Sequence, residues 1–236
     1  MSTRHRRPWG IASLVVVVLL VSCAKQPEAT FAEPYKVTVA GDSISFGLGA
    51  AIRTQVSARP NSVTKVIGIG GTGLARPDNF DWPSRLDTLA AERPPKVLVV
   101  SVGSNDAQDL TDAAGTTTAR FAPEATDDGA EWNRSYSARL ARIFDTFRGS
   151  ATTVVWVGQV RTGDDRVGST NRRIHRLAVA LAAERPWVTV ADLGQLLGSN
   201  DAVATDCLLA DNLHLKVSCY ERAAEQLNAR FPPQGL

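Results

Sequence analysis

The sequence predicts an α/β protein, a three-layer α/β/α domain built on a five-stranded parallel sheet. Short apolar runs rich in β-branched residues recur along the chain, as is typical of buried strands. The segments between them have the apolar spacing of helices, and prolines follow two of them. Regular alternation of these two kinds of segment favours a parallel sheet with helices on both faces.

The expected strands are short runs in which almost every residue is apolar or β-branched. In chain order they are Lys36–Ala40, Val63–Ile67, Val97–Val102, Thr152–Val157 and Trp187–Val190.

The expected helices lie between and after these strands. They are Ser45–Ala58, Trp82–Pro94, Glu131–Phe147, Asn171–Pro186 and Val217–Phe231. The connection over 108–130 has neither pattern and is rich in Thr, Asp, Ala and Gly. Because loops of this length are usually functional or disordered, we interpret it as a candidate lid.

The N-terminus has the layout of a secretory signal, with a basic start and an apolar run over Ile11–Val21. The tetrapeptide ending at Cys23, Leu-Val-Ser-Cys, resembles the bacterial lipobox, in which the cysteine is lipidated. The sequence therefore predicts a signal peptide over 1–22, a tether over 23–35 and a folded domain over 36–232. The protein is expected to be exported and held at the outer face of the membrane through Cys23. The alternative is an N-terminal membrane anchor that stays attached.

Composition limits the partners of the chain. Its 236 residues and 25.3 kDa suit one domain, and its apolar content of 44% is ordinary for a globular protein. The formal net charge is only +2, and three of the arginines lie in the expected signal peptide. No basic surface is predicted, so nucleic acid is not expected as a partner. The sequence does not specify the oligomeric state, and a monomer is the expectation.

Export also determines how the cysteines are interpreted. Cys207 and Cys219 remain as a pair in an oxidising compartment, where a disulfide is the default. The alternative is a metal site shared with Asp211 and His214. That alternative lacks the C-x-x-C spacing of metal sites, and a disulfide would use both thiolates, so no metal is expected.

Ligands of open parallel sheets bind beyond the carboxyl ends of the strands. Ser43 follows the first expected strand, where helix N-capping is its simplest role. Asn105 follows the third expected strand and could donate to an oxyanion, with an Asx-turn as the alternative. Asp211 and His214 can supply an orienting carboxylate and a base. His175 lies in an arginine-rich helical segment and is interpreted as a solvated surface residue.

The stretch "GIGGTG", Gly68 to Gly73, matches the G-x-G-x-x-G pattern of dinucleotide sites. Such a fingerprint should lead directly into a helix. Here Pro77 and Pro83 come before the helical pattern resumes. The match therefore fails its context test, and no cofactor is expected.

Together these segments resemble the GDSL, or SGNH, hydrolase family over about Lys36–Phe231. The motifs are G-D-S ending at Ser43, a glycine after the second strand, G-x-N-D over Gly103–Asp106, and D-x-x-H over Asp211–His214. Ile44 stands where the family name has leucine. The resemblance implies the flavodoxin-like SGNH hydrolase fold.

The resemblance also implies roles for individual residues. Ser43 would be the nucleophile, His214 the base and later the acid, and Asp211 the residue that orients it. The oxyanion hole would comprise the Ser43 amide, the Gly71 amide and the Asn105 side chain, with Gly70 as the alternative glycine. Trp82, near the mouth of the site, is a candidate substrate contact, although an aromatic residue beside proline more often packs locally.

The implied activity is hydrolysis of carboxylic esters with short acyl groups, on a small-molecule, glycan or lipid ester substrate. Two alternatives remain open at this point. One is an O-acyltransferase acting on cell-envelope glycans through the same site. The other is a non-catalytic binding lipoprotein on the same fold.

Overall fold

A computed structural model describes residues 33–200 and 202–234 of the chain. The expected signal peptide, Cys23 and nearly all of the tether lie outside these residues. Among the helices that are described, none is long and apolar enough to cross a membrane.

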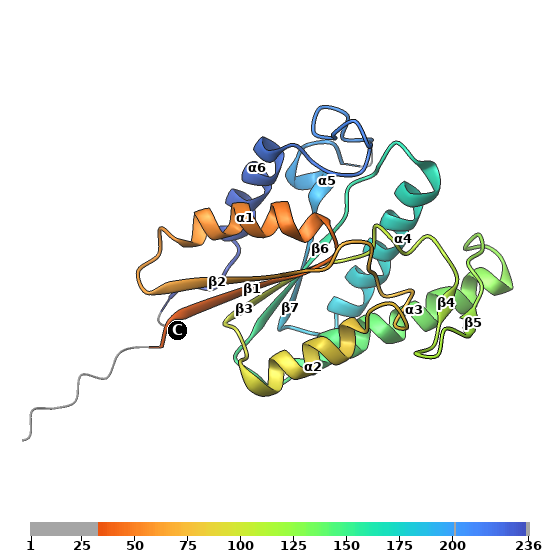
Figure 1. The fold of residues 1–236 in the computed structure, drawn as a ribbon, viewed down its shortest axis with the longest axis horizontal. Helices are drawn as coiled ribbons and strands as arrows, with labels where there is room; N and C mark the ends of the chain where they lie inside the picture. The colour runs from red at the N-terminus through yellow and green to blue at the C-terminus, as the bar shows by residue number, and fades with distance from the viewer. Residues whose placement is uncertain (1–32, 201, 235–236) are drawn as a thin grey trace, which may run out of the picture. The chain divides into compact units, whose positions relative to one another are not determined.

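Five parallel strands form the central sheet (Figure 1), as predicted. In spatial order they are β2 (Ser62–Gly68), β1 (Tyr35–Gly41), β3 (Val97–Ser101), β6 (Thr153–Gly158) and β7 (Val188–Asp192). The chain enters the sheet at β1. Strand β2 then pairs with one edge of β1, and β3 pairs with the other. That reversal places the topological switch point at β1 and β3, where ligands of doubly wound folds bind.

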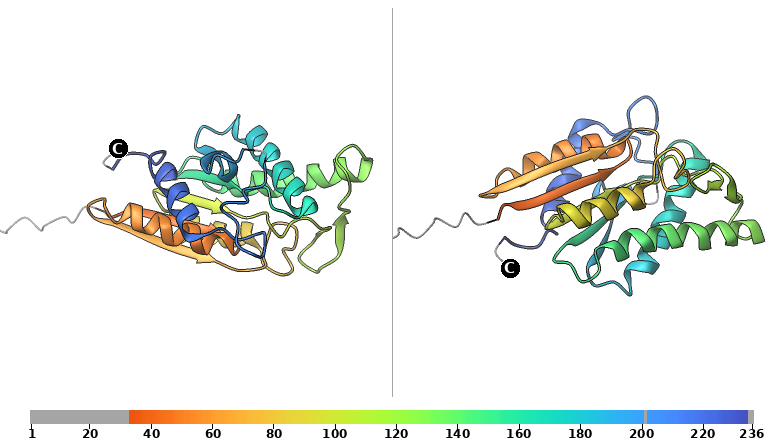
Figure 2. Two further views of the ribbon diagram at one scale, coloured as in Figure 1. Left: turned by 90° about the horizontal axis from the view of Figure 1, so that it is seen from above. Right: turned by 60° about the horizontal axis from the view of Figure 1, so that its bottom comes forward.

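Helices cover both faces of the sheet (Figures 1 and 2), which confirms the three-layer prediction. One face carries α1 (Ile44–Val56), the short α5 (Leu193–Leu196) and α6 (Val217–Asn228). The other face carries α2 (Trp82–Glu92), α3 (Asp127–Thr146) and α4 (Asp165–Ala182).

Strand β6 illustrates how the two cores form. Val155 and Val157 pack into the core under α1 and α6, whereas Val154 and Trp156 pack into the core under α2, α3 and α4. Alternate side chains of a strand point to opposite faces, so a strand buried on both sides is apolar throughout. This explains why the runs of the central strands β3 and β6 were visible in the sequence, whereas the edge strands β2 and β7 are only partly buried.

Two helices begin earlier than predicted because their first turns are polar. Thr126 caps α3 by accepting the Gly129 amide, and Asp164 caps α4 by accepting the Val167 amide. Caps of this kind satisfy amide groups that lack partners within the helix.

The segment 108–130, predicted as a long loop and candidate lid, is ordered and attached to the domain. It contains the antiparallel hairpin of β4 (Leu110–Thr111) and β5 (Thr117–Ala119), followed by the start of α3. Arg173 of α4 donates to the carbonyl oxygens of Ala122 and Gly129. These bonds hold the segment against α4. The expectation of a connection without helix or strand is therefore wrong, whereas the role as a lid stays a prediction.

Candidate active site

Ser43 lies between β1 and α1, at the switch point of the sheet. The preceding turn passes so close to β3 that a side chain on Gly41 would lie 1.9 Å from the Ser101 carbonyl oxygen. Asp42, not Ser43, accepts the free Ile44 amide, at 3.0 Å. The Ser43 hydroxyl instead lies 2.8 Å from His214 Nε2. This contact distinguishes Ser43 from an ordinary helix-capping serine.

His214 is oriented by Asp211 in the loop before α6. His214 Nδ1 lies 2.7 Å from Asp211 Oδ2, and Asp211 Oδ1 accepts the amides of Leu213 and His214. Asn212 between them has a φ of 57°, a left-handed conformation that asparagine tolerates better than most residues. The structure thus brings Ser43, His214 and Asp211 into one hydrogen-bonded relay.

The Asp211 carboxyl remains ionised in this arrangement. The Leu213 amide, the His214 ring and the His214 amide lower its pKa to about 2. In the tautomer that carries its proton on Nδ1, His214 donates to the Asp211 carboxylate and directs the Nε2 lone pair at the Ser43 hydroxyl. The relay therefore has the proton arrangement that a general base requires.

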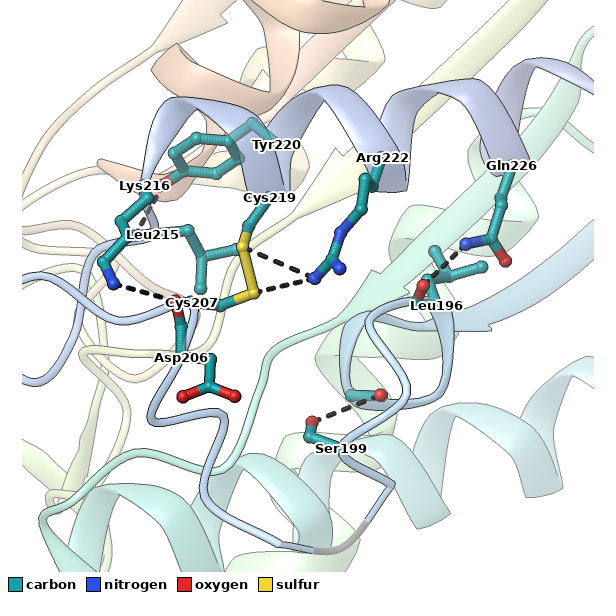
Figure 3. The surroundings of a disulfide bond; sticks show 11 residues. Leu196, Ser199, Asp206, Cys207, Leu215, Lys216, Cys219, Tyr220, Arg222 and Gln226 are labelled. Carbon is teal, nitrogen blue, oxygen red and sulfur yellow. Dashed lines mark hydrogen bonds between the residues drawn. A yellow bond between two sulfur atoms is a disulfide. The ribbon is translucent and has the colours of Figure 1, made fainter.

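The predicted disulfide between Cys207 and Cys219 is present and encloses the Asp211–His214 loop. Two backbone bonds pair the loop's ends: the Leu209 amide donates to the His214 carbonyl oxygen and the Lys216 amide to that of Cys207. Arg222 of α6 lies across the disulfide, with Nη2 3.1 Å from Cys207 Sγ (Figure 3). Because both sulfurs are bonded, the alternative of cysteine ligands to a metal is excluded.

Two of the three glycines of the G-x-G-x-x-G match, Gly68 and Gly73, allow a close approach. A side chain on Gly68 would clash with Phe46, and one on Gly73 would lie 2.0 Å from Asp106 Oδ1. Gly70 faces the nucleophile, since a Cβ there would lie 3.9 Å from that of Ser43. The loop does not lead into a helix until Trp82.

Gly71 follows in the left-handed conformation, with a φ of 72°. Among the described residues, no atom lies within 4 Å of the position that a side chain on Gly71 would take. The Asn79 side chain donates to the Gly71 carbonyl oxygen at 3.3 Å. Both candidate glycines, Gly70 and Gly71, thus lie in the loop that passes Ser43.

Asn105 reaches across to this glycine loop instead of closing its own turn. Its Nδ2 donates to the Thr72 carbonyl oxygen at 2.8 Å, and its backbone carbonyl accepts Gln108 Nε2. A side-chain amide carries two N–H groups, and the bond to Thr72 uses one of them. The side chain is half-buried, between the glycine loop and the carboxyl end of β3.

Two carboxyl groups near the site had no role in the sequence analysis. Asp42 is fully buried and accepts the amides of Ile44 and Gly103, and burial raises its pKa to about 7. Asp106 is also fully buried, and burial raises its pKa. Both are members of the motifs themselves, Asp42 of G-D-S and Asp106 of G-x-N-D, which was the signal that could have drawn attention to them.

Trp82 was wrongly predicted as a candidate substrate contact. It is 0% exposed, and its Nε1 donates to Thr72 Oγ1 at 3.0 Å. Trp82 is the first residue of α2, followed by Pro83, and its indole packs in the core beneath the glycine loop. The alternative of local packing is correct.

His175 was also wrongly interpreted as a solvated residue. Its side chain is only 20% exposed, and its Nε2 lies 3.4 Å from Asp192 Oδ2. The α4 surface that carries it turns toward the ends of β6 and β7, where Gly158 leaves room for the ring.

Within 33–200 and 202–234, no group of three or more potential ligands is placed to hold a metal ion.

Solved structures of GDSL and SGNH proteins share this fold. A lipolytic protein of the G-D-S-L family from Veillonella parvula is 15% identical, with a TM-score of 0.58 over 83% of this chain and 97% of its own. An acetylxylan esterase from Geobacillus stearothermophilus is 16% identical, with a TM-score of 0.59 over 86% and 97%. The catalytic domain of a peptidoglycan O-acetyltransferase from Streptococcus pneumoniae is 13% identical, with a TM-score of 0.55 over 85% and 98%.

These likenesses define the class of fold: the protein has the α/β/α architecture of the GDSL/SGNH hydrolases. Within that class, the chain belongs to the family described as "Protein of unknown function (DUF459)", whose model matches residues 36–213. No curated protein matches the chain significantly.

Proposed function

We propose that the protein is a serine esterase that hydrolyses carboxylic esters of short acyl groups. The observation that carries the proposal is the relay of Ser43 Oγ, His214 and Asp211, with contacts of 2.8 Å and 2.7 Å. These three groups meet from opposite ends of the domain sequence. Such a relay lets an otherwise weakly nucleophilic hydroxyl attack a carbonyl carbon.

The reaction would proceed through an acyl-enzyme. His214 Nε2 takes the proton of Ser43 as its oxygen bonds to the acyl carbon, and the carbonyl oxygen becomes an oxyanion. The Ser43 amide, the Gly71 amide and the Asn105 side chain are the proposed donors to that oxyanion. When the tetrahedral intermediate collapses, His214 returns the proton to the departing alcohol. Water then attacks the acyl-enzyme as His214 takes its proton. The carboxylic acid leaves when the proton returns to Ser43.

The exposure of the relay supports a bulky alcohol portion. The side chains of Asp211 and His214 are 50% and 34% exposed, so the site opens outward on the side of the base. Neither the cavity at the amino ends of β1 and β3 nor the cavity beside α3 is lined by Ser43, Asp211 or His214. An open site suits a small acyl group carried on a large molecule, such as a cell-envelope glycan.

A second candidate is acyl transfer to a glycan hydroxyl. The same openness beside His214 would admit an alcohol as readily as water, and the two reactions differ only in which one attacks the acyl-enzyme. The fold likeness to a peptidoglycan O-acetyltransferase is compatible with this candidate. A non-catalytic binding protein is disfavoured, because binding alone does not require the complete relay.

Hydrolysis of p-nitrophenyl esters from acetyl to long-chain tests the proposal, with and without a glycan acceptor. We expect acetyl release without acceptor, and loss of that activity in Ser43→Ala with the fold intact. Ser57→Ala, at the other end of α1, is the matched control and should keep full activity. A Ser43→Ala protein that hydrolyses at the wild-type rate would overturn the proposal, whereas release only with acceptor would favour the transferase.

We also propose that the protein works outside the cytoplasm, attached to the membrane through lipidated Cys23. The lipobox-like tetrapeptide ending at Cys23 and the signal-like segment before it support this proposal. Incorporation of a labelled fatty acid in cells that express the full chain tests it. The wild-type chain should carry the label and Cys23→Ala should lack it, and a label that persists in Cys23→Ala would contradict the proposal.

A further inference from the structure

We propose that Asp106 is a positioning residue. It sets the distance between two of the proposed oxyanion donors, the Gly71 amide in the glycine loop and the Asn105 side chain. This inference rests on the proposed function. Asp106 touches neither the nucleophile nor the base. Its action would be indirect, through the loop of residues 70–75 and through its direct neighbour Asn105.

The first argument is the set of hydrogen bonds that the Asp106 carboxylate accepts. The Leu74 amide donates to Oδ2 at 2.9 Å, and the Ala75 amide donates to Oδ1 at 2.8 Å. The Tyr136 hydroxyl of α3 donates to Oδ2 at 2.7 Å. One buried side chain therefore joins the segment after β2, the segment after β3 and the helix behind them.

The second argument is that Asn105 and Asp106 contact the same loop at adjacent points. Asn105 Nδ2 donates to the Thr72 carbonyl oxygen, while Asp106 accepts the amides two and three residues later. The two side chains are consecutive in sequence, so their separation is fixed by one peptide unit. Any displacement of the Asp106 carboxylate changes where the glycine loop sits relative to Asn105.

The third argument is steric. A side chain on Gly73 would lie 2.0 Å from Asp106 Oδ1, so the carboxylate occupies space that any other residue would fill. Real atoms do not approach so closely without displacement of the neighbour. The last glycine of the G-x-G-x-x-G match is thereby explained as the position that admits Asp106.

The fourth argument is that the opposite side of the same backbone is held by a cation. Arg139 of α3 donates to the carbonyl oxygens of Leu74 and Ala75, whose amides Asp106 accepts. The peptide groups of the loop are thus fixed from both sides, by a carboxylate on N–H and a guanidinium on C=O. An oxyanion hole needs this rigidity because preorganised donors stabilise the developing charge without reorganisation.

The kinetic consequence concerns the transition state and not ground-state binding. Loss of one oxyanion donor typically lowers kcat by about 100- to 1,000-fold. A donor that is present but displaced should lower kcat by a smaller factor, about 10- to 100-fold, with KM nearly unchanged. The effect should also depend on the atom that becomes charged, since the hole is built for oxygen.

The experiment compares Asp106→Asn, Tyr136→Phe and the control Asp145→Asn on an acetate ester and its thionoester analogue. Asp145 accepts Arg185 and Arg148 and is not part of the site. We expect Asp106→Asn to lower kcat for the ester by about 10- to 100-fold while changing the thionoester rate much less. Tyr136→Phe keeps both backbone bonds and should show the same selective loss at a smaller size. The control should match wild type.

Equal losses on the ester and the thionoester would overturn the inference, because they would indicate general misfolding. Unchanged kcat in both variants would overturn it too. If Asp106→Asn does not fold, the ester-to-thionoester ratio of Tyr136→Phe decides in the same way. These outcomes require hydrolysis that depends on Ser43, so failure of the proposed function is detected separately by Ser43→Ala.

Discussion

Two aspartates near Ser43 are ionised differently because their surroundings differ. Asp211 lies at the surface, where hydrogen bonds from the Leu213 amide and from His214 lower its pKa to about 2. Asp42 is fully buried, and loss of hydration raises its pKa to about 7. The first carboxyl is a permanent charge for His214. The second holds the backbone around the nucleophile.

The raised pKa of Asp42 predicts a specific dependence of stability on pH. The folded-state pKa lies above the unfolded value of 3.8, so the contribution to stability is present below about pH 4 and is lost as pH rises toward 7. The free energy of unfolding should fall with a slope of at most about 1.4 kcal/mol per pH unit from this group. The contribution of Asp42 is measured as the difference in the free energy of unfolding between wild type and Asp42→Asn, from urea unfolding at pH 4.5 to 7.5.

Comparison of the two proteins controls for groups that do not interact with Asp42. Burial raises the pKa of Asp106 as well, and the charge of Asp106 raises the pKa of Asp42, so the measured difference includes their mutual repulsion. Asp211, whose pKa is lowered, acts below the chosen range. A difference that stays constant across the pH range would contradict the account of Asp42.

At this scale, the sequence allowed prediction of residues whose chemistry is distinctive. A serine, an asparagine and an Asp-x-x-His pair at the ends of strands have few competing roles when they occur together, and the structure brings them together. Asp106 could not be assigned a role in this way, because its partners at Leu74 and Ala75 are more than 30 residues away. The substrate contact suggested for Trp82 was wrong, because a sequence does not show whether an aromatic side chain points into the core or toward the site.

At the scale of elements, the loop that carries Asp211 and His214 is the least regular part of the site. It has no helix or strand of its own, and its ends are joined by the disulfide, by backbone bonds and by a bridge between Leu208 and Leu215. Figure 3 shows Cys219 on α6, so the bond anchors the loop to a packed helix. We infer that the disulfide positions the base as well as stabilising the domain.

Reduction of the disulfide should therefore lower activity before it unfolds the protein. Closing a loop of this size contributes about 3 kcal/mol in the chain-entropy model. We expect at least a tenfold loss of ester hydrolysis after reduction and alkylation verified by mass, with far-ultraviolet circular dichroism unchanged. The double variant Cys207→Ser, Cys219→Ser should behave in the same way. Equal activity before and after complete reduction would refute the positioning role.

Helices and strands that bury apolar side chains were predictable from the sequence. Elements that are held by polar contacts in turns were not. The five strands and the centres of the helices matched the structure because burial on one or both faces leaves a periodic pattern. The hairpin in 108–130 is held by its turn, where Asp112 accepts the amides of Ala114 and Thr116 and Gly115 has a φ of 83°. Such contacts leave no periodicity in a sequence.

At the scale of the whole molecule, the strand order explains why distant segments converge. The reversal of connection at β1 leaves the carboxyl ends of β1 and β3 adjacent, and the loop after β2 crosses beside them. Alternation of strands and helices in the sequence predicted the parallel sheet. The order of the strands followed only from the resemblance to a known fold, since periodicity does not specify which strands are neighbours.

Covalent labelling tests the central claim, that Ser43 is an activated nucleophile, without knowledge of the natural substrate. The folded domain is treated with a fluorophosphonate, and the adduct is located by mass spectrometry in wild type, Ser43→Ala and the control Ser57→Ala. We predict one adduct on Ser43, its absence in Ser43→Ala and wild-type labelling in the control. Absence of labelling in the folded wild-type protein, or labelling that persists in Ser43→Ala, would contradict the account.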